Sequence, residues 1–214
     1  MSPQRLRRRE APRLYHALRD SFHGDLVDGA SARGGLETLG ALGKTRFIAF
    51  VAASIDGRIS LSEKTVPRWT SKEDWRFFQH SLARMDAVVV GRNTYAAVAG
   101  RLRKRNTFVL SNGPKTMVRR GSVTFLNPAK VALTPLLAKY KSVAVLGGGA
   151  VYRFMLESEL LDEMFVTLEP LIFGRGKEMF VGGTRTTRVT LLSIKRLNRA
   201  GTLLLHYQIN RWRP

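Results

Sequence analysis

Three consecutive glycines, Gly147, Gly148 and Gly149, stand where an apolar run gives way to helix-forming residues. The residues before them, from Val143 to Leu146, are typical of a strand, and those after them favour a helix. Glycines at such a junction let a ligand approach the backbone closely, and the free N–H groups of a helix start attract anions. The run predicts a phosphate-bearing cofactor. A tight turn is the alternative, because the pattern is not Gly-x-Gly-x-x-Gly.

Two other strand ends carry similar residues. The segment Gly91-Arg92-Asn93-Thr94 adds a cationic and a hydroxyl donor to a second glycine, and Ser111-Asn112-Gly113 closes the next strand. Ligands gather at the carboxyl ends of parallel strands, so these segments are candidates for binding further cofactor phosphates. The alternative for the first segment is a plain strand-to-helix turn with Asn93 as its N-cap.

Asp74 is the acidic side chain singled out for chemistry. We expect a helix that starts at Thr70, with Glu73 completing a capping box. Asp74 and Phe78 would then project from one helix face, beside Trp69 or Trp75 and toward an apolar cleft. A carboxylate there resists ionisation and makes paired hydrogen bonds to an amidine-like edge of a heterocycle. The alternative is an acid that only complements the helix dipole.

The charge of the chain is strongly positive. Its 36 Lys and Arg residues exceed its 16 Asp and Glu residues, which gives a formal charge of +20. Residues 1–45 contain eight of the basic and five of the acidic residues, so residues 46–214 contain 28 and 11, or +17. Between Asp86 and Glu157 there are twelve basic residues and no acidic one. This favours anionic ligands, either a polyphosphate cofactor with an acidic substrate or nucleic acid; solvated surface charges are the other interpretation.

Several classes of protein are disfavoured. The chain has no cysteine, and its four histidines lack ligand spacing, so we expect no metal centre. No Gly-x-Ser-x-Gly or Walker sequence is present. No apolar run approaches the roughly 20 residues of a membrane span. We expect a cytoplasmic protein, with organelle targeting by the Arg-rich N-terminus as an alternative.

The apolar pattern predicts a basic N-terminal extension and linker at residues 1–45 and an α/β domain at residues 46–214. The run from Arg46 to Ser54 is a central strand covered on both faces. A polar loop from Asp56 to about Trp69 is a candidate lid. Strands and helices then alternate, and an antiparallel hairpin closes a mixed, mostly parallel sheet with helices on both faces. The expected elements are strands at 87–91, 107–111, 123–126, 142–146, 163–168, 189–197 and 203–209, and helices at 93–98, 127–140 and 148–157.

From about Arg46 to Arg211 the chain resembles dihydrofolate reductase. The resemblance rests on the joint order of several landmarks: Val51-Ala52-Ala53 with Asp56-Gly57-Arg58-Ile59; Trp69, Asp74 and Phe78; Val90 to Tyr95; Asn106 to Ser111; Gly147 to Tyr152; and Leu161 to Thr167. It implies a fold of that family and NADPH-dependent hydride transfer to C6 of 7,8-dihydrofolate, with protonation at N5. The product, tetrahydrofolate, would serve one-carbon metabolism.

The resemblance also implies roles for individual residues. Asp74 would hold the pterin and favour its protonation, and Thr167 would bind the Asp74 carboxylate. Phe50, Val51, Phe78 and Val98 would line the substrate pocket, and Ile59 is expected there and beside the cofactor. The cofactor would contact Ala52, Ile59, Gly91, Arg92, Asn93, Thr94, Ser111, Asn112, Leu146, Gly147, Gly148, Gly149, Ala150, Val151 and Tyr152.

The sequence departs from the family at two places. The usual Leu-Pro-x-Arg-x-Asn, whose Arg clamps the folate carboxylate, is replaced by Leu102-Arg103-Lys104-Arg105-Asn106, so Arg105 is our choice for the clamp, followed by Lys104. Ala150 stands where a basic residue often meets the 2′-phosphate, which leaves Arg92 and Asn112 to select NADPH over NADH.

Two alternative functions stay open. The ribosylaminopyrimidine phosphate reductase of riboflavin biosynthesis shares the fold, and the segment from Ser54 to Ile59 fits it well. A non-catalytic RNA-binding protein on a reductase scaffold would account for the basic charge. A homodimer is compatible with the sequence.

Overall fold

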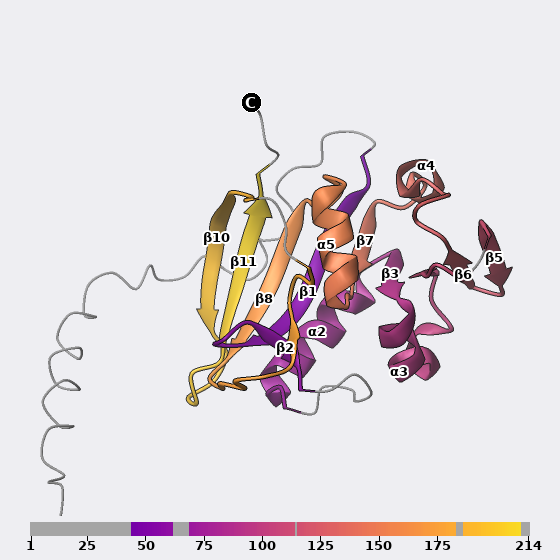
Figure 1. Ribbon diagram of the computed structural model, residues 1–214. Coiled ribbons are helices and arrows are strands. Elements are labelled where there is room, and N and C mark those ends of the chain that lie inside the picture. The colour runs from indigo at the N-terminus through magenta and orange to yellow at the C-terminus, as the bar shows by residue number, and fades with distance from the viewer. Residues whose placement is uncertain (1–43, 62–68, 114, 183–185, 211–214) are drawn as a thin grey trace, which may run out of the picture. The chain divides into compact units, whose positions relative to one another are not determined.

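The computed structural model describes residues 44–61, 69–113, 115–182 and 186–210 (Figure 1). Strands and helices alternate through most of this range. The elements are β1 (Arg46–Ser54), β2 (Arg58–Ser60), α2 (Lys72–Ala83), β3 (Ala87–Gly91), α3 (Arg92–Leu102), β4 (Thr107–Leu110), β5 (Met117–Arg120), β6 (Val123–Leu126), α4 (Leu133–Leu137), β7 (Ser142–Val145), α5 (Gly149–Glu157), β8 (Glu163–Glu169), β9 (Lys177–Glu178), β10 (Val189–Arg196) and β11 (Leu203–Ile209).

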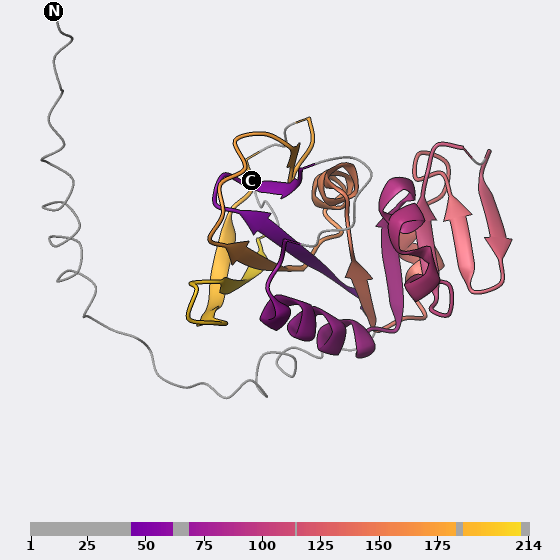
Figure 2. The same ribbon diagram turned by 90° about the horizontal axis from the view of Figure 1, so that it is seen from below.

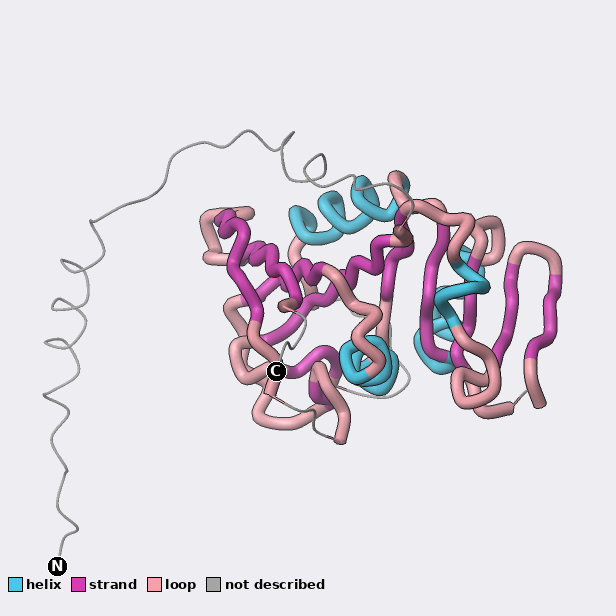
Figure 3. Tube along the Cα trace, turned by 90° about the horizontal axis from the view of Figure 1, so that it is seen from above, coloured by secondary structure: helices cyan, strands magenta, loops and turns pink. Residues whose placement is uncertain are grey.

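A nine-stranded sheet forms the body of the molecule, in the order β10-β11-β8-β1-β7-β3-β4-β6-β5. The strands from β8 to β6 pair in parallel, whereas β11 and β10 at one edge and β5 at the other are antiparallel to their neighbours. Helices α2 and α5 cover opposite faces of the sheet (Figures 2 and 3). The predicted mixed, mostly parallel α/β sheet with a C-terminal antiparallel hairpin is therefore confirmed.

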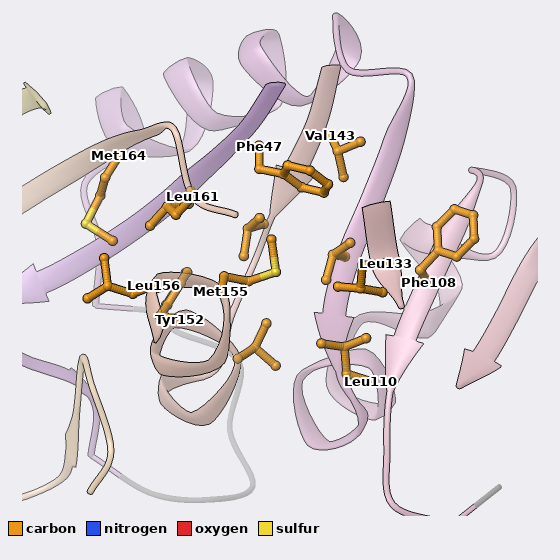
Figure 4. Packing of buried hydrophobic residues seen from close by; sticks show 14 of the residues in the cluster. Phe47, Phe108, Leu110, Leu133, Val143, Tyr152, Met155, Leu156, Leu161 and Met164 are labelled. Carbon is orange, nitrogen blue, oxygen red and sulfur yellow. The ribbon is translucent and has the colours of Figure 1, made fainter. Parts of the chain in front are cut away.

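Strand β1 is central because its apolar run is buried on both faces. Successive side chains of a strand point to opposite sides. Phe47, Ala49 and Val51 belong to the cluster that packs against α5 (Figure 4), and the alternate residues, Phe50 among them, face α2. Tyr152 of α5 is buried in this cluster, and its hydroxyl donates a hydrogen bond to the Phe50 carbonyl at 2.6 Å. The core thus ties α5 to the strand that separates the two helical layers.

The structure corrects several predicted elements. The helix expected over 127–140 is confined to α4, because Asn127 begins a turn whose side chain accepts the backbone N–H of Ala129. Helix α3 begins at Arg92, with Gly91 rather than Asn93 as its N-cap, and runs on to Leu102 through a kink at Val98. Strands β2, β5 and β9 were not predicted, because they are too short or too exposed to show a pattern.

Two predicted segments lie wholly or partly outside the described residues. The N-terminal extension at 1–45 overlaps them only at Lys44 and Thr45, and residues 62–68 of the expected lid are not described. Within the described range, no helix is both long and apolar enough to span a membrane.

Candidate active site

A cavity of about 1050 Å³ opens between α2, the carboxyl ends of β3 and β7, and the β2–β9 pair. Its wall contains nearly every residue that the sequence analysis assigned to substrate or cofactor. These are Phe50, Val51, Ala52, Ile59, Asp74, Phe78, Gly91, Arg92, Asn93, Thr94, Val98, Arg105, Ser111, Asn112, Leu146, Gly148, Gly149, Ala150, Val151, Tyr152 and Thr167. Gly147 is the exception. It is buried, and its carbonyl accepts the Gly91 N–H at 2.7 Å. This hydrogen bond links the turn after β7 to the turn after β3.

Asp74 is placed by the first turn of α2. The N-cap is Ser71 rather than the expected Thr70, and its hydroxyl accepts the Asp74 N–H at 3.2 Å. The expected capping box with Glu73 is absent from this turn, because the Glu73 carboxylate accepts a hydrogen bond from Asn198. Asp74 is 8% exposed, and its carboxyl accepts hydrogen bonds from the hydroxyls of Thr167 and Thr70. The structure thus brings Thr167, which the resemblance pairs with Asp74, next to the Asp74 carboxyl.

The surroundings of Asp74 favour its protonated form. Burial raises the pKa of the Asp74 carboxyl, the two threonine hydroxyls oppose part of that rise, and the negative charge of Glu169 adds to it. A carboxyl of this kind holds its proton more tightly than an exposed aspartate does, and it can hydrogen-bond the polar edge of a ligand in the cavity. Asp74 is thus buried in the wall of the cavity, as expected of a helix acid turned toward a cleft.

An aromatic wall lies beside Asp74. Phe50 stacks on Phe165 at 5.4 Å and packs against Phe77 and Phe78 at 6.3 Å each. Phe77 and Phe165 were missed in the sequence analysis. The signal for Phe165 was available, because it precedes Thr167 by two residues on one strand and must share its face. These rings provide flat apolar surface for a planar heterocycle.

The opposite end of the cavity fits a phosphate-bearing cofactor. The N-caps of α3 and α5 are Gly91 and Gly148, which have no side chain to satisfy the N–H groups of the first turns. A Cβ on Gly147 would lie 2.6 Å from the Tyr152 ring, and one on Gly149 would lie 2.6 Å from a backbone carbonyl. The glycines are therefore required by close packing, and Arg92 lies exposed at the cavity wall. The residues present fit a dinucleotide pyrophosphate.

Basic side chains border the cavity mouth. Arg105 is half-buried and donates a hydrogen bond to the Leu82 carbonyl, at the end of α2, at 3.0 Å. Lys104 is exposed and outside the cavity wall. Arg101, which the sequence analysis missed, lines the cavity with its guanidinium 4.7 Å from the centre of the Trp75 ring. Arg101 and Arg105 thus give this part of the cavity wall a positive charge that suits an anionic group.

The start of the expected lid is fixed by Asp56. Its carboxylate accepts the Ser54 hydroxyl at 2.6 Å and the N–H groups of Phe173 and Gly174 at 3.0 and 2.8 Å. These bonds, the Ser54 bond above all, lower the pKa of Asp56 to about 2. The next residues form β2, which pairs with β9 and brings Ile59 to the cavity.

Comparison with solved structures places this fold among known reductases. RibD of Acinetobacter baumannii superposes with a TM-score of 0.66 at 19% identity, covering 79% of this chain and 59% of RibD. A pyrimidine reductase-like protein of Corynebacterium diphtheriae gives 0.64 at 17% identity, covering 79% and 93%. Dihydrofolate reductase of Enterococcus faecalis, complexed with NADP(H), gives 0.55 at 20% identity, covering 78% and 97%. These likenesses show the dihydrofolate reductase-like fold.

Sequence comparison agrees with the fold. The uncharacterized protein YwjB of Bacillus subtilis (strain 168) is 24% identical over 170 residues, which cover 75% of this chain and 95% of YwjB. The family model described as dihydrofolate reductase matches residues 47–169, from the central strand to the end of β8. That match includes Asp74, Thr167 and all three glycine turns. The chain belongs to the dihydrofolate reductase family, an oxidoreductase family.

Proposed function

We propose that this protein reduces 7,8-dihydrofolate to tetrahydrofolate with NADPH. The observation that supports the proposal is the buried Asp74 carboxyl, bonded to the Thr167 hydroxyl and set beside the aromatic wall in the cavity that also holds the glycine turns. A pterin offers an amino group and a ring N–H on one edge, which match the two oxygens of a carboxylate. Its flat ring matches the phenylalanine surfaces.

NADPH, when bound, supplies the hydride. The chain would orient both rings: the first turns of α3 and α5, with Arg92, would hold the phosphates, and Leu146 and Tyr152 would flank the nicotinamide. Asp74 would hold the pterin edge and favour the form protonated at N5. The apolar lining excludes water from the reacting atoms.

A second candidate function has a specific observation in its favour. Arg105, the predicted folate clamp, donates one guanidinium N–H to the Leu82 carbonyl, so that N–H is not free to bind a folate carboxylate. Arg101 and Arg92 remain exposed at the cavity. A ribosylaminopyrimidine phosphate, as the riboflavin pathway uses, needs a phosphate site rather than a carboxylate clamp, and the likeness to RibD is consistent with it.

The deciding experiment follows the nicotinamide absorbance with dihydrofolate and with the ribosylaminopyrimidine phosphate in parallel, each with NADPH and with NADH. We expect oxidation of NADPH with dihydrofolate. Turnover with the pyrimidine phosphate alone would establish the second candidate. Salt-sensitive RNA binding without any NADPH binding would instead favour the scaffold alternative.

Arginine variants sharpen the comparison between the two substrates. Arg105→Ala should raise the KM for dihydrofolate, because a charge-assisted carboxylate contact would be lost. Lys104→Ala is the matched control, since that side chain lies outside the cavity wall, and it should leave the KM unchanged. Equal effects of both substitutions would point to a general loss of positive field rather than to a clamp.

A further inference from the structure

Glu169, the last residue of β8, is a buried carboxylate that the proposed reaction does not use. The residue is 3% exposed. One oxygen accepts the backbone N–H of Ser71 at 2.6 Å, and the other accepts the hydroxyl of Thr202 at 2.7 Å. Thr202 lies at the turn before β11 and also bonds Asn198. Glu169 is not part of the cavity wall, so it acts through its neighbours rather than on a ligand.

Strand alternation places Glu169 on the same face of β8 as Thr167, the residue that contacts Asp74. Thr167 and Glu169 are two residues apart on β8 and therefore point to the same face, toward α2. Thr167 bonds the Asp74 carboxyl, and Glu169 bonds the backbone of Ser71, the N-cap of the same helical turn. One strand face thus holds both the side chain and the backbone of the turn that carries Asp74.

The hydrogen bond from the Ser71 N–H to Glu169 frees the Asp74 carboxyl from a capping role. In a capping box, the residue three positions after the N-cap turns its side chain back to the N-cap N–H. That position is Asp74 in α2. Because Glu169 satisfies the Ser71 N–H from the neighbouring strand, the Asp74 carboxyl is released from capping and turns into the cavity.

We propose that Glu169 is a positioning residue of the reductase site, which anchors the first turn of α2 to β8 and directs Asp74 toward the substrate. The inference rests on the proposed function. It also assigns a second effect to the same carboxylate: its negative charge lies close enough to oppose ionisation of Asp74. The acid that raises the proton affinity of Asp74 thus lies outside the cavity wall, where it does not occupy space for a ligand.

Other charged groups around Asp74 come from three directions. On α2, Glu73 bonds Asn198 and lies near Arg76. From α3 and the residues after it, Arg101 and Arg105 line the cavity. The remaining charged residues of the cavity wall are Arg92, Lys177 and Glu178. Of these neighbours, Glu169 is the one that raises the pKa of Asp74 in the described structure.

Two substitutions separate charge from anchoring. Glu169→Gln removes the charge but keeps an oxygen that accepts the Ser71 N–H, and Glu169→Ala removes both hydrogen bonds. The matched control is Glu163→Gln, on the same face of β8 but six residues earlier, about 20 Å along the strand. The Glu163 carboxylate bonds Arg46 and His206 instead.

The first measurement is a carbon-13 NMR titration of aspartate-labelled full-length protein, with the Asp74 signal assigned by its loss in Asp74→Asn. We expect the titration of Asp74 to move to lower pH in Glu169→Gln and to stay in place in Glu163→Gln. An unchanged titration in Glu169→Gln would overturn the electrostatic assignment. This measurement needs no turnover, so it remains decisive even if neither substrate is reduced and the proposed function fails.

The second measurement compares kcat/KM with the NADPH Kd. Glu169→Ala should lower kcat/KM by up to about 100-fold through misplacement of Asp74, while NADPH binding at the distant glycine turns is retained. Glu169→Gln should keep most of the rate and shift its pH profile as the titration shifts. A parallel loss of NADPH affinity and kcat/KM in Glu169→Ala would show general damage and overturn the positioning role.

Discussion

Asp74→Asn should lower the activity and raise the stability of the protein. Burial places the carboxyl in the cavity, and the same burial makes its ionised form unfavourable in the folded state. The substitution keeps the shape of the side chain and leaves the Thr167 and Thr70 hydroxyls as partners. It removes the proton source and the charge-assisted contact with the substrate. Positioned acid–base groups contribute about 10²–10⁴-fold, so kcat/KM should fall by that factor, or about 2.7–5.5 kcal/mol of transition-state stabilisation.

The stability of the same variant should change in the opposite direction. Because burial raises the pKa of Asp74 in the folded state, its protonated form contributes stability that is complete below the unfolded pKa. That stability is lost as pH rises through the folded pKa. The Asn variant stays neutral, so it should melt at a higher Tm than the parent protein at neutral pH, and the two should converge in acid.

The assay combines NADPH absorbance with thermal unfolding across pH. The gain in unfolding free energy should equal about 1.36 kcal/mol for each unit between the folded and unfolded pKa of Asp74. Glu73→Gln is the control, because Glu73 is adjacent on α2 but its pKa is lowered, first by a hydrogen bond from its own backbone. It should keep the activity and gain no stability at neutral pH. An Asp74→Asn variant that retains turnover, or that melts earlier than the parent, would refute the reasoning.

Three further perturbations have outcomes set by single contacts. Tyr152→Phe removes the 2.6 Å hydrogen bond to the Phe50 carbonyl and should lower the free energy of unfolding by about 1–3 kcal/mol in denaturant titrations. Gly147→Ala places a Cβ 2.6 Å from the Tyr152 ring at a φ of +78°, so both the Tm and the NADPH affinity, measured by fluorescence, should fall. Gly100→Ala is the control, because a Cβ there meets nothing within 4 Å. Since Gly100 lies in α3, that substitution should stabilise the protein by about 0.5–1 kcal/mol. Asp56, with a pKa of about 2, contributes stability that is lost as the pH falls from about 4 through 2. The Tm of Asp56→Asn should therefore depend less on pH than the Tm of the parent protein in this range. An equal dependence in the variant and the parent would contradict the anchoring role of Asp56.

Local patterns in the sequence predicted much of the sheet. The bounds of β3, β6 and β11 agree with the prediction, because short runs rich in apolar residues between turn residues leave little freedom in where a buried strand starts and stops. The predicted helix at 127–140 was wrong, because its apolar spacing also suits a turn followed by one short helix packed through Leu133 and Leu137. The exposed edge strand β5 has no pattern that differs from a loop.

The sequence by itself determined which residues are able to do chemistry: an acid near a helix start, three glycine turns after strands, and a threonine on a strand. Their convergence on one cavity required the tertiary structure, because β1, β3, β7 and β8 are neighbours only in the sheet order. The cap of α2 shows the limit most clearly. Thr70 and Ser71 are equally good N-caps by a local rule. The structure selects Ser71, whose backbone N–H is bonded by Glu169, 98 residues away in the chain and near only once the strand is in place.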